Sequence, residues 1–351
     1  MKDILYHTTI CESTLACEPM IERMPNGELL CLCQLDGPME PHPDNRVYFM
    51  HSADDGKAWS EKRPICHSDK AVYCTELTVQ GDKATAFITF HSGRFLDWQC
   101  RVFESDDNGY TWQDKGPAPL VPDYTFVRRR VVLKNGDVLY PYQHYDVTPE
   151  MVTALKNNPD IPEEQKFVWK TGAKTAYCGV LISHDGGKTF ENRIACEISL
   201  ENRWIWPEPH VAEFEAGHLV MLIRPSLVGR LSKCESFDGG NTWGSITETD
   251  IPNPSNKPFF MGLENGDAVL LHTPNDTNLG QPGVKGHRTP FEAWFTNDGA
   301  ETWYKKVHIS DDSRCDYADA FEEDGKLYIV QEHFRKTVEF YILDLKEGQN
   351  K

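Results

Sequence analysis

Ser105-Asp106-Asp107-Asn108-Gly109-Tyr110-Thr111-Trp112 is the stretch of sequence that decides the fold, because its pattern recurs along the chain. The pattern is Ser/Thr-x-Asp-x-Gly-x-Thr-Trp, and residues 236–243 form a second complete copy. Three further copies begin at Ser52, Ser183 and Thr296, and each departs from the pattern at one position. We expect the Asp to accept backbone N–H hydrogen bonds, the Gly to adopt a positive φ, and the final aromatic residue to anchor the turn in the core. A spaced repeat of this kind predicts a repetitive architecture.

A tight turn between two apolar runs recurs in phase with this pattern. Its glycines are Gly27, Gly81, Gly136, Gly217, Gly266 and Gly325. Asn-Gly or Asp-Gly between apolar runs is a strong signal for a β-hairpin. The unit therefore reads as strand, tight turn, strand, long loop, strand, Asp-pattern turn, strand. Six such units predict an all-β fold, a six-bladed β-propeller of four-stranded antiparallel sheets, whose closed ring leaves few exposed strand edges.

Composition agrees with one repetitive domain that spans residues 1–351. The chain is 39% hydrophobic, and no apolar run reaches the roughly 18 residues of a membrane span. The net charge of −18 argues against nucleic acid or an anionic membrane as a partner. The eleven cysteines show no zinc-binding spacing, so we expect no metal and no cofactor. Residues 1–7 do not resemble a signal peptide, so we expect a cytoplasmic protein; the oligomeric state is left open.

One interval between the hairpin glycines is too long. The six glycines are separated by 54, 55, 81, 49 and 59 residues, and the surplus in the third interval lies at about 146–170. Thr148 followed by Pro149 is typical of a helix start, and the Asn158-Pro159 pair would end the helix. We interpret the segment as a loop or helical insertion, which could be a lid over a site, an oligomer contact or neither.

Propeller connectivity places both turn motifs on one face and gathers polar residues at the other. That second face collects the starts of the first and third strands of each blade and the ends of the second strands. Its residues include Glu18, Glu76, Arg128, Glu208, Lys257, Tyr317, Asp319, Gln34, His91, His144, Arg224, His272, His333, Asp44, Arg46 and Arg288. So many polar groups at the narrow centre of a ring predict a ligand site. Trp206 and His144 are expected to line a sugar pocket there.

The chain resembles the sialidase superfamily of Asp-box (BNR) propellers over essentially its whole length. The resemblance lies in Trp206-Pro207-Glu208-Pro209-His210 with Leu222-Ile223-Arg224, in Arg288, and in Cys315-Asp316-Tyr317-Ala318-Asp319. It implies that Tyr317 is the nucleophile, that Glu208 takes its proton, and that Asp44 is the acid/base. Arg224 and Arg288 would be two of three arginines that bind the substrate carboxylate. A tyrosine suits a sugar acid, because the acid's own carboxylate would repel a carboxylate nucleophile.

The opening strand departs from the family pattern. The family has an Arg-Ile-Pro motif there that supplies the first arginine, whereas this chain has Cys17-Glu18-Pro19-Met20-Ile21. A carboxylate at that place would repel a sialic acid carboxylate, so specificity for sialic acid is left open. We expect Glu18 to bind sugar hydroxyls instead, with Arg128 from the next blade as a replacement cation.

Three functions fit these residues. The first is a sialidase-like exo-glycosidase that hydrolyses a terminal, acidic sugar, and it is the one that we favour. The second is a polysaccharide lyase that removes a proton beside a uronate carboxylate, with His144 or Tyr145 as base and Arg128 and Arg224 at the carboxylate. The third is a non-catalytic glycan-binding propeller. All three require a carbohydrate partner.

Overall fold

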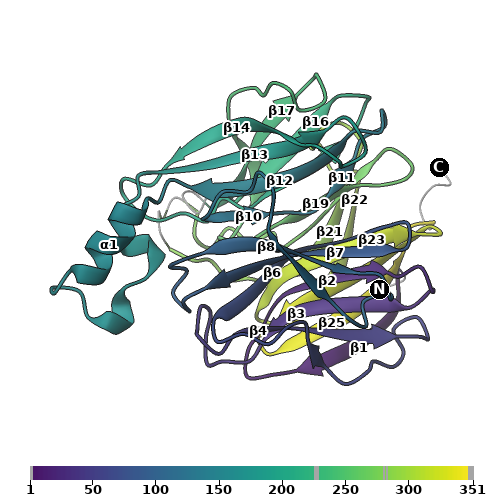
Figure 1. Ribbon diagram of the computed structural model, residues 1–351. Helices are drawn as coiled ribbons and strands as arrows, with labels where there is room; N and C mark the ends of the chain where they lie inside the picture. The colour runs from purple at the N-terminus through teal and green to yellow at the C-terminus, as the bar shows by residue number, and fades with distance from the viewer. Residues whose placement is uncertain (1–2, 225–228, 280, 282–283, 347–351) are drawn as a thin grey trace.

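The computed structural model describes residues 3–224, 229–279, 281 and 284–346, and these fold into six antiparallel sheets around a common centre (Figure 1). This confirms the predicted all-β, six-bladed propeller. The first blade is β2 (Ala16–Arg23), β3 (Leu29–Leu35), β4 (Arg46–Ser52) and β5 (Arg63–Pro64). The second is β6 (Ala71–Gln80), β7 (Lys83–His91), β8 (Gln99–Ser105) and β9 (Gln113–Pro117). In both, neighbours in sequence are neighbours in the sheet.

The third blade differs because its innermost strand is broken. Its strands are β10 (Thr125–Val127), β11 (Val131–Val132), β12 (Val138–Tyr145), β13 (Thr175–Ser183) and β14 (Glu191–Ser199), and both β10 and β11 pair with β12. The fourth blade is β15 (Pro209–Glu213), β16 (Leu219–Ile223), β17 (Arg230–Ser236) and β18 (Thr247–Pro252). The fifth is β19 (Phe259–Gly262), β20 (Ala268–His272), β21 (Phe291–Thr296) and β22 (Lys305–Ser310).

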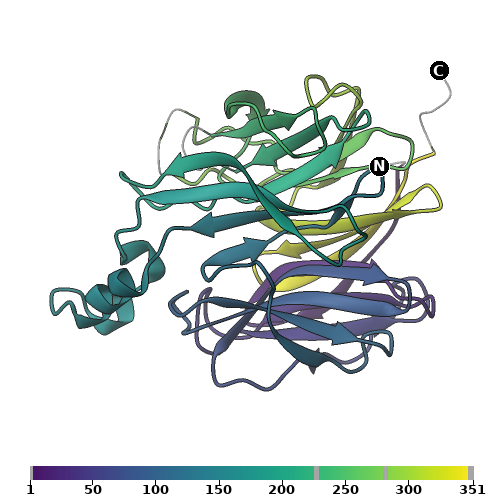
Figure 2. The same ribbon diagram turned by 45° about the horizontal axis from the view of Figure 1, so that its top comes forward.

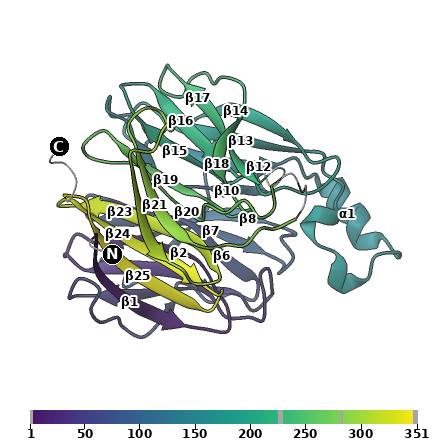
Figure 3. The same ribbon diagram turned by 180° about the vertical axis from the view of Figure 1, so that it is seen from behind.

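The sixth blade is assembled from both ends of the described chain. It consists of β23 (Cys315–Glu323), β24 (Lys326–His333), β25 (Thr337–Asp344) and β1 (Ile4–Glu12). β1 pairs antiparallel with β25, with Thr8 opposite Phe340, so the two lie side by side in Figure 3. Because β1 supplies the outer strand, no turn is needed after β25. This explains why six blades carry only five Asp-pattern turns.

The Asp-pattern turns have the geometry that the sequence predicts. In the second blade, Asp107 accepts hydrogen bonds from the backbone N–H and the hydroxyl of Thr111 at 2.8 and 2.7 Å. Gly109 has φ +83°, and Trp112 Nε1 donates to its carbonyl at 2.9 Å. Ala300, which replaces the glycine in the fifth blade, keeps the left-handed conformation with φ +63°. The turn is therefore retained where the residue that favours it is missing.

Gly56 offers a test of how tightly these turns pack on the neighbouring blade. A Cβ at Gly56 would lie 2.1 Å from Cε1 of the buried Phe340, and its φ is +84°. We expect Gly56→Ala to lower the free energy of unfolding by about 2–5 kcal/mol, from overpacking and left-handed strain together. Gly27→Ala is the matched control, because Gly27 has φ +89° but open space around it, so only the strain remains. Equal losses in chemical denaturation would contradict the packing argument.

A buried cluster of charges lies between the innermost strands of the first, second, third and sixth blades. Arg129 contacts Glu22 at 2.7 Å and Asp319 at 3.4 Å, and the backbone N–H of Arg130 donates to Glu76 at 2.9 Å. Burial raises the pKa of Glu76 to about 8, and Arg129 only partly offsets this. Three acids around Arg129 therefore favour retention of a proton on Glu76 near neutral pH.

This cluster predicts a loss of stability as the pH rises from about 4.5 to about 8. A carboxyl group whose pKa is raised on folding stabilises the native state fully at low pH, and that contribution is lost as the pH rises through the folded pKa. We expect the melting temperature to fall between about pH 4.5 and 8, and Glu76→Gln, which mimics the protonated acid, to remove part of the fall. The variant should match the wild type below about pH 4.5, where Glu76 is protonated in both the folded and the unfolded state. A constant difference at every pH would contradict this account.

The predicted insertion contains a helix and projects from one side of the ring (Figure 2). α1 (Pro149–Asn157) begins after Thr148, whose hydroxyl accepts a hydrogen bond from the N–H of Met151 at 3.3 Å, so the predicted helix start is confirmed. Two short 3-10 turns follow, η1 (Glu163–Gln165) and η2 (Val168–Lys170). Val168 is fully buried and its N–H donates to the carbonyl of Arg94, which ties the segment to the second blade. Within the described residues, no helix has the length and apolarity that crossing a membrane requires.

Candidate active site

A cavity of about 520 Å³ opens at the end of the blades opposite the Asp-pattern turns. It is lined by Glu40, Pro41, Tyr73, Phe95, Phe126, Trp169, Arg203, Trp204, Trp206, Glu208, Arg224, Ser255, Lys285, Arg288, Tyr317 and Arg335. Five of the residues singled out from the sequence therefore meet in one place: Trp206, Glu208, Arg224, Arg288 and Tyr317. Their chemical roles stay predictions.

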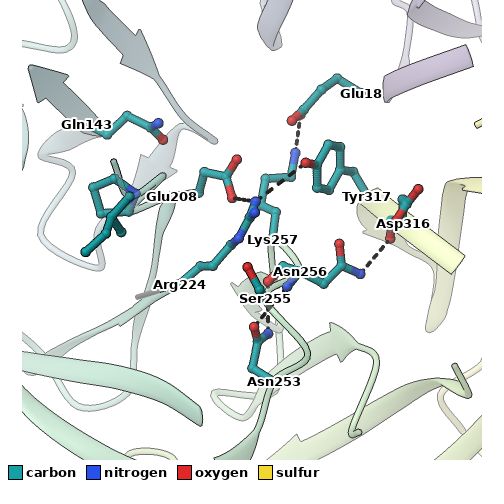
Figure 4. Close-up of polar contacts among 12 residues, drawn as sticks. Glu18, Gln143, Glu208, Arg224, Asn253, Ser255, Asn256, Lys257, Asp316 and Tyr317 are labelled. Atoms are coloured by element: carbon teal, nitrogen blue, oxygen red, sulfur yellow. Dashed lines mark hydrogen bonds and ion pairs between the residues drawn. The ribbon is translucent and has the colours of Figure 1, made fainter. Parts of the chain in front are cut away.

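Glu208 and Arg224 are neighbours because of strand pairing. They flank the paired ends of β15 and β16, where Pro209 lies opposite Ile223. Arg224 Nη1 lies 2.6 Å from Glu208 Oε2 and 3.5 Å from the hydroxyl of Tyr317 (Figure 4). One guanidinium nitrogen thus contacts both the carboxylate and the phenol, and it holds them at the same point of the cavity wall.

Tyr317 is aimed into the cavity by an irregularity in its strand. The register of β23 against β24 shifts between Cys315 and Ala318, and such bulges re-aim side chains beside functional sites. Burial raises the pKa of Tyr317, although neighbouring arginines oppose the change. Lys257 Nζ lies 5.0 Å from the ring centroid, so the neutral phenol is held among cations.

Arg288 is fixed by two acceptors. Its Nη1 pairs with Asp316 Oδ1, and its Nη2 donates to the carbonyl of Ser255 at 2.9 Å. Ser255 is buried with φ +65°, which turns that carbonyl toward the guanidinium. Burial alone would raise the pKa of Asp316, but Arg288, Arg314 and Arg335 lower it to about 2. Asp316 therefore remains a carboxylate and keeps Arg288 in place.

Arg335 was missed by the sequence reading. It lies in the tight turn between β24 and β25, where both Phe334 and Arg335 have positive φ. It pairs with Glu40, and its carbon Cζ lies 5.9 Å from the ring centroid of Tyr317. The sequence reading stopped at the end of β24, at His333. The turn between β24 and β25 lies on the same face of the propeller as the ends of the second strands. The connectivity of the blade therefore contained enough information to include Arg335 among the candidate residues.

Glu18 and Arg128 do not contact the cavity, so the prediction that they bind substrate directly is wrong. Glu18 is 0% and Arg128 1% exposed. Glu18 pairs with Lys257 and lies 3.5 Å from Arg128, and Arg128 in turn lies 3.7 Å from Glu208. The carboxylate in the opening strand is therefore neutralised inside the protein by Lys257 and Arg128. Glu18 is connected to Glu208 through the buried Arg128, and it does not face a ligand.

Asp44 and His144 are also wrongly placed by the sequence reading. The side chain of Asp44 is 71% exposed and lies beside His42, and Glu40 of the same loop reaches the cavity instead. His144 bonds to Thr125 at 2.9 Å and lines a separate pocket, because successive side chains of a strand point to opposite faces. Its neighbour Gln143 points inward and accepts from Arg128 at 2.9 Å.

The residues expected for a lyase are not assembled in the cavity. His144 lies in the separate pocket, and Tyr145 is 0% exposed. The hydroxyl of Tyr145 accepts from Gln143 at 3.0 Å and donates to the carbonyl of Ile205 at 3.2 Å. Neither predicted base is available to a ligand bound beside Arg224.

Another part of the cavity lining is aromatic. Trp206 contacts Phe95, Trp204 and Trp169 at ring-centroid distances of 5.4, 5.5 and 6.5 Å. Trp169 belongs to η2, so the insertion contributes to the cavity. A cationic side and an aromatic side are suited to a sugar that carries an anionic group, since the flat apolar face of a sugar packs on aromatic rings.

Residues 27–329 match the family of BNR repeat-like domains. The chain belongs to this family. Its membership of the Asp-box (BNR) propellers, expected from the sequence, is thereby confirmed. A search of curated proteins returned no match.

Solved structures similar to this BNR propeller include several sialidases. The Hadza microbial sialidase Hz136 has a TM-score of 0.71 at 16% identity; the alignment covers 95% of this chain and 66% of that one. The leech intramolecular trans-sialidase has a TM-score of 0.70 at 12% identity; the alignment covers 97% of this chain and 70% of that one. A Dyadobacter fermentans protein of unknown function has a TM-score of 0.69 at 16% identity; the alignment covers 98% of this chain and 99% of that one. At these identities the likeness establishes the fold alone.

Proposed function

We propose that this BNR propeller is a sialidase-like exo-glycosidase that hydrolyses a terminal acidic sugar. The observation that supports it is the meeting of Arg224, Arg288 and Arg335 with Tyr317 and Glu208 in one cavity. The three arginines come from the fourth, fifth and sixth blades. Their guanidiniums can bind a carboxylate in bidentate geometry, which orients the sugar ring as well as holding it. The sialidases among the similar folds point to the same class of reaction.

The reaction is derived from Tyr317 and Glu208. The Tyr317 oxygen attacks the anomeric carbon while its proton passes to Glu208, and the bond from that carbon to the leaving oxygen breaks. A water molecule then attacks the same carbon and gives a proton to the carboxylate that had protonated the leaving oxygen. The bond to the Tyr317 oxygen breaks, and the phenol recovers its proton from Glu208. Because burial raises the pKa of Tyr317, the phenol is neutral at rest, so attack requires a base within the cavity. Arg224, in contact with both groups, holds them together for that transfer.

Glu40 is our candidate for the proton donor to the leaving oxygen. Among the described residues, Glu40 and Glu208 are the carboxyl groups that line the cavity. Without substrate, Glu40 pairs with Arg335. A substrate carboxylate that binds Arg335 would take the place of Glu40 as its partner and add a negative charge nearby. Glu40 would then be released from Arg335 and could turn toward the leaving oxygen, where general acid catalysis needs a donor.

Glu40→Gln should affect poor leaving groups most. An alkyl or sugar leaving group depends strongly on protonation, whereas 4-nitrophenolate departs without it. We expect kcat toward a natural glycoside to fall on the order of 100-fold, and kcat toward the 4-nitrophenyl glycoside of the same sugar to fall less than about tenfold. Steady-state kinetics on both substrates would measure this. Equal losses on the two substrates would contradict a role in proton donation.

A parallel screen of chromogenic glycosides tests the proposed function. Sialic, uronic and neutral sugars would be compared, and release of the chromophore from at least one acidic sugar, with little from neutral ones, is expected. A product that absorbs in the ultraviolet as an unsaturated uronate would identify a lyase instead. Binding of sugar acids without turnover of any substrate would identify a glycan-binding propeller.

A further inference from the structure

Tyr317 and Glu208 are connected by a second route that runs inside the protein, beside the central cavity. Oxygen Oε2 of Glu18 contacts Lys257 Nζ and lies 3.5 Å from Arg128 Nη1. Arg128 Nη2 in turn lies 3.7 Å from Glu208 Oε1. At the other end, Lys257 Nζ lies 5.0 Å from the ring centroid of Tyr317. With the contacts of Arg224, these distances close a ring of six side chains, which we call the charged ring: Glu18, Arg128, Glu208, Arg224, Tyr317 and Lys257.

The charged ring is buried and its charges alternate. Each of its six residues is exposed by 7% or less. From Lys257 to Arg224, three cations alternate with two carboxylates. The phenol of Tyr317 is neutral, because burial raises its pKa. Charges are weakly screened where water is excluded, so a change of charge at one member acts strongly on its neighbours.

The loop that carries Lys257 is fixed to the strand that carries Tyr317. Asn256 Nδ2 donates to the carbonyl oxygens of Cys315 and Asp316 at 3.0 and 3.3 Å (Figure 4). These two residues come directly before Tyr317 in β23. Lys257 therefore keeps its place against the phenol ring.

Arg128 is also held in one position. Its Nη2 and Nε donate to Gln143 Oε1 at 2.9 and 3.2 Å, and its backbone N–H donates to the carbonyl of Pro141 at 2.7 Å. Its carbon Cζ lies 5.3 Å from the ring centroid of Phe126. The positive charge beside Glu208 is therefore fixed by its surroundings as well as by the two carboxylates.

Other titratable groups beside the charged ring favour their uncharged forms, because burial moves the pKa of each far from its usual value. It raises the pKa of two tyrosines and a glutamate and lowers that of a histidine: Tyr73, Tyr145, Glu332 and His210. On the cavity side, the phenol of Tyr317 also faces Arg288, Arg335 and Glu40. Among the described residues, the charges in contact with Glu208 are those of Arg224 and Arg128.

The charged ring changes its net charge when Glu208 acts as the base. As the Tyr317 oxygen bonds to the sugar, its proton passes to Glu208, which becomes neutral. The net positive charge of the ring then rises by one. The carboxylate of Glu18 offsets that increase, since it stays beside Arg128. Without this carboxylate, Glu208 would lie in a more positive environment and would be a weaker base.

We propose that Glu18 is a positioning residue that keeps Glu208 basic enough to take the proton of Tyr317. Glu18 does not touch the substrate. It acts by balancing the charge of Arg128 and by holding Lys257 against the phenol. This role rests on the proposed function, in which Glu208 is the base. It accounts for the acid that stands in the opening strand where the sialidase pattern has an arginine.

The acidic limb of the pH profile of kcat/KM tests this role, because it reports the base of the free enzyme. The probes are the 4-nitrophenyl glycosides of N-acetylneuraminic acid and of galacturonic acid, used with the full-length chain. Glu18→Gln keeps the shape of the side chain and removes its negative charge. We expect the limb to move to lower pH by about one unit and kcat at the optimum to fall about tenfold. The affinity for the two free sugar acids, measured by titration, should change less than about threefold, since Glu18 does not line the cavity.

Arg128→Gln should move the limb the other way, to higher pH by about one unit, because it removes a positive charge that lies beside Glu208. It leaves the other two ion pairs of the charged ring intact, so it should fold. Glu18→Gln, in contrast, leaves Lys257 buried without an acid and could fail to fold. In that case Arg128→Gln decides: since Glu18 reaches Glu208 through Arg128, an unmoved limb would overturn the role by itself.

Glu22→Gln is the matched control. Glu22 lies four positions after Glu18 in the same strand and pairs with Arg129, outside the charged ring. Burial raises the pKa of Glu22 to about 7, so this group is already uncharged over the acidic limb. Its limb should coincide with that of the wild type.

Opposite shifts of the limb in Glu18→Gln and Arg128→Gln, with the control unmoved, are the expected result. Shifts smaller than about 0.3 pH unit, or shifts in the same direction, would overturn the role of Glu18 and leave the proposed function standing. If the wild-type sequence hydrolyses neither glycoside, both proposals are overturned.

Discussion

Replacing Tyr317 by phenylalanine is expected to lower kcat by about a thousandfold or more, with little change in the affinity for the substrate. The reason is that the variant keeps the ring among Lys257, Arg288 and Arg335 and removes only the hydroxyl that we propose as the nucleophile. Steady-state kinetics give kcat, and titration with a sugar acid gives the affinity. Because Arg224, at 3.5 Å, is the hydrogen-bond partner of this hydroxyl among the described residues, the fold should be preserved.

Tyr73→Phe is the matched control for that experiment. Tyr73 also lines the cavity and is buried, but it belongs to β6 and lies outside the pair formed by Glu208 and Arg224. We expect its kcat to fall by less than about tenfold. A Tyr317→Phe variant with more than about a tenth of the wild-type kcat would exclude tyrosine as the nucleophile.

Replacing Arg335 by alanine is expected to lower kcat/KM for acidic sugars by about a hundredfold. A hydrogen bond to a charged group is worth about 1.5–3 kcal/mol, which corresponds to roughly ten- to a hundredfold, and a bidentate pair can exceed that. The loss should appear for acidic substrates and not for residual turnover of neutral ones, because only the former present a carboxylate. Arg335→Lys keeps the charge but loses the planar guanidinium. Its kcat/KM for acidic sugars should lie between those of the wild type and of Arg335→Ala.

The control for Arg335 is Arg193→Ala. Arg193 is only partly buried, pairs with Glu191 in β14, and is not among the described residues that line the cavity. Its kcat/KM should match the wild type on every substrate. Equal losses on acidic and neutral substrates in Arg335→Ala would show that Arg335 supports the shape of the cavity and does not bind the carboxylate.

The fold was predictable from the sequence because its signals are local. An Asp-pattern turn such as 105–112 specifies its own hydrogen bonds, and a glycine such as Gly27 specifies its own backbone conformation. The helix start at Thr148 is local in the same sense. The outer strand of the sixth blade was not predicted, since its pairing joins β1 to β25 across the whole chain and no local pattern records that contact.

The site was predictable in part, and the limits are physical. Glu208 and Arg224 lie at paired strand ends, which the hairpin pattern determines. His144 was misplaced by a single residue of strand alternation, which reverses the face of the sheet. Asp44 was misplaced because a loop does not reveal which of its side chains turn inward. The burial of Glu18 depends on Lys257 from another blade, and no short stretch of sequence shows such a partner.

Closure of the ring by β1 makes the geometry of the candidate site depend on contacts between the two ends of the described chain. His7 and Glu339, which bond at 3.0 Å, are separated by 332 positions. Contacts of such long range form late and slowly, because the intervening chain must first be ordered. Arg335 lies in the turn between β24 and β25, and β1 pairs with β25. A molecule that has folded five blades would therefore possess most of its secondary structure before Arg335 is in position. We expect recovery of ligand binding to follow recovery of the circular dichroism signal during refolding.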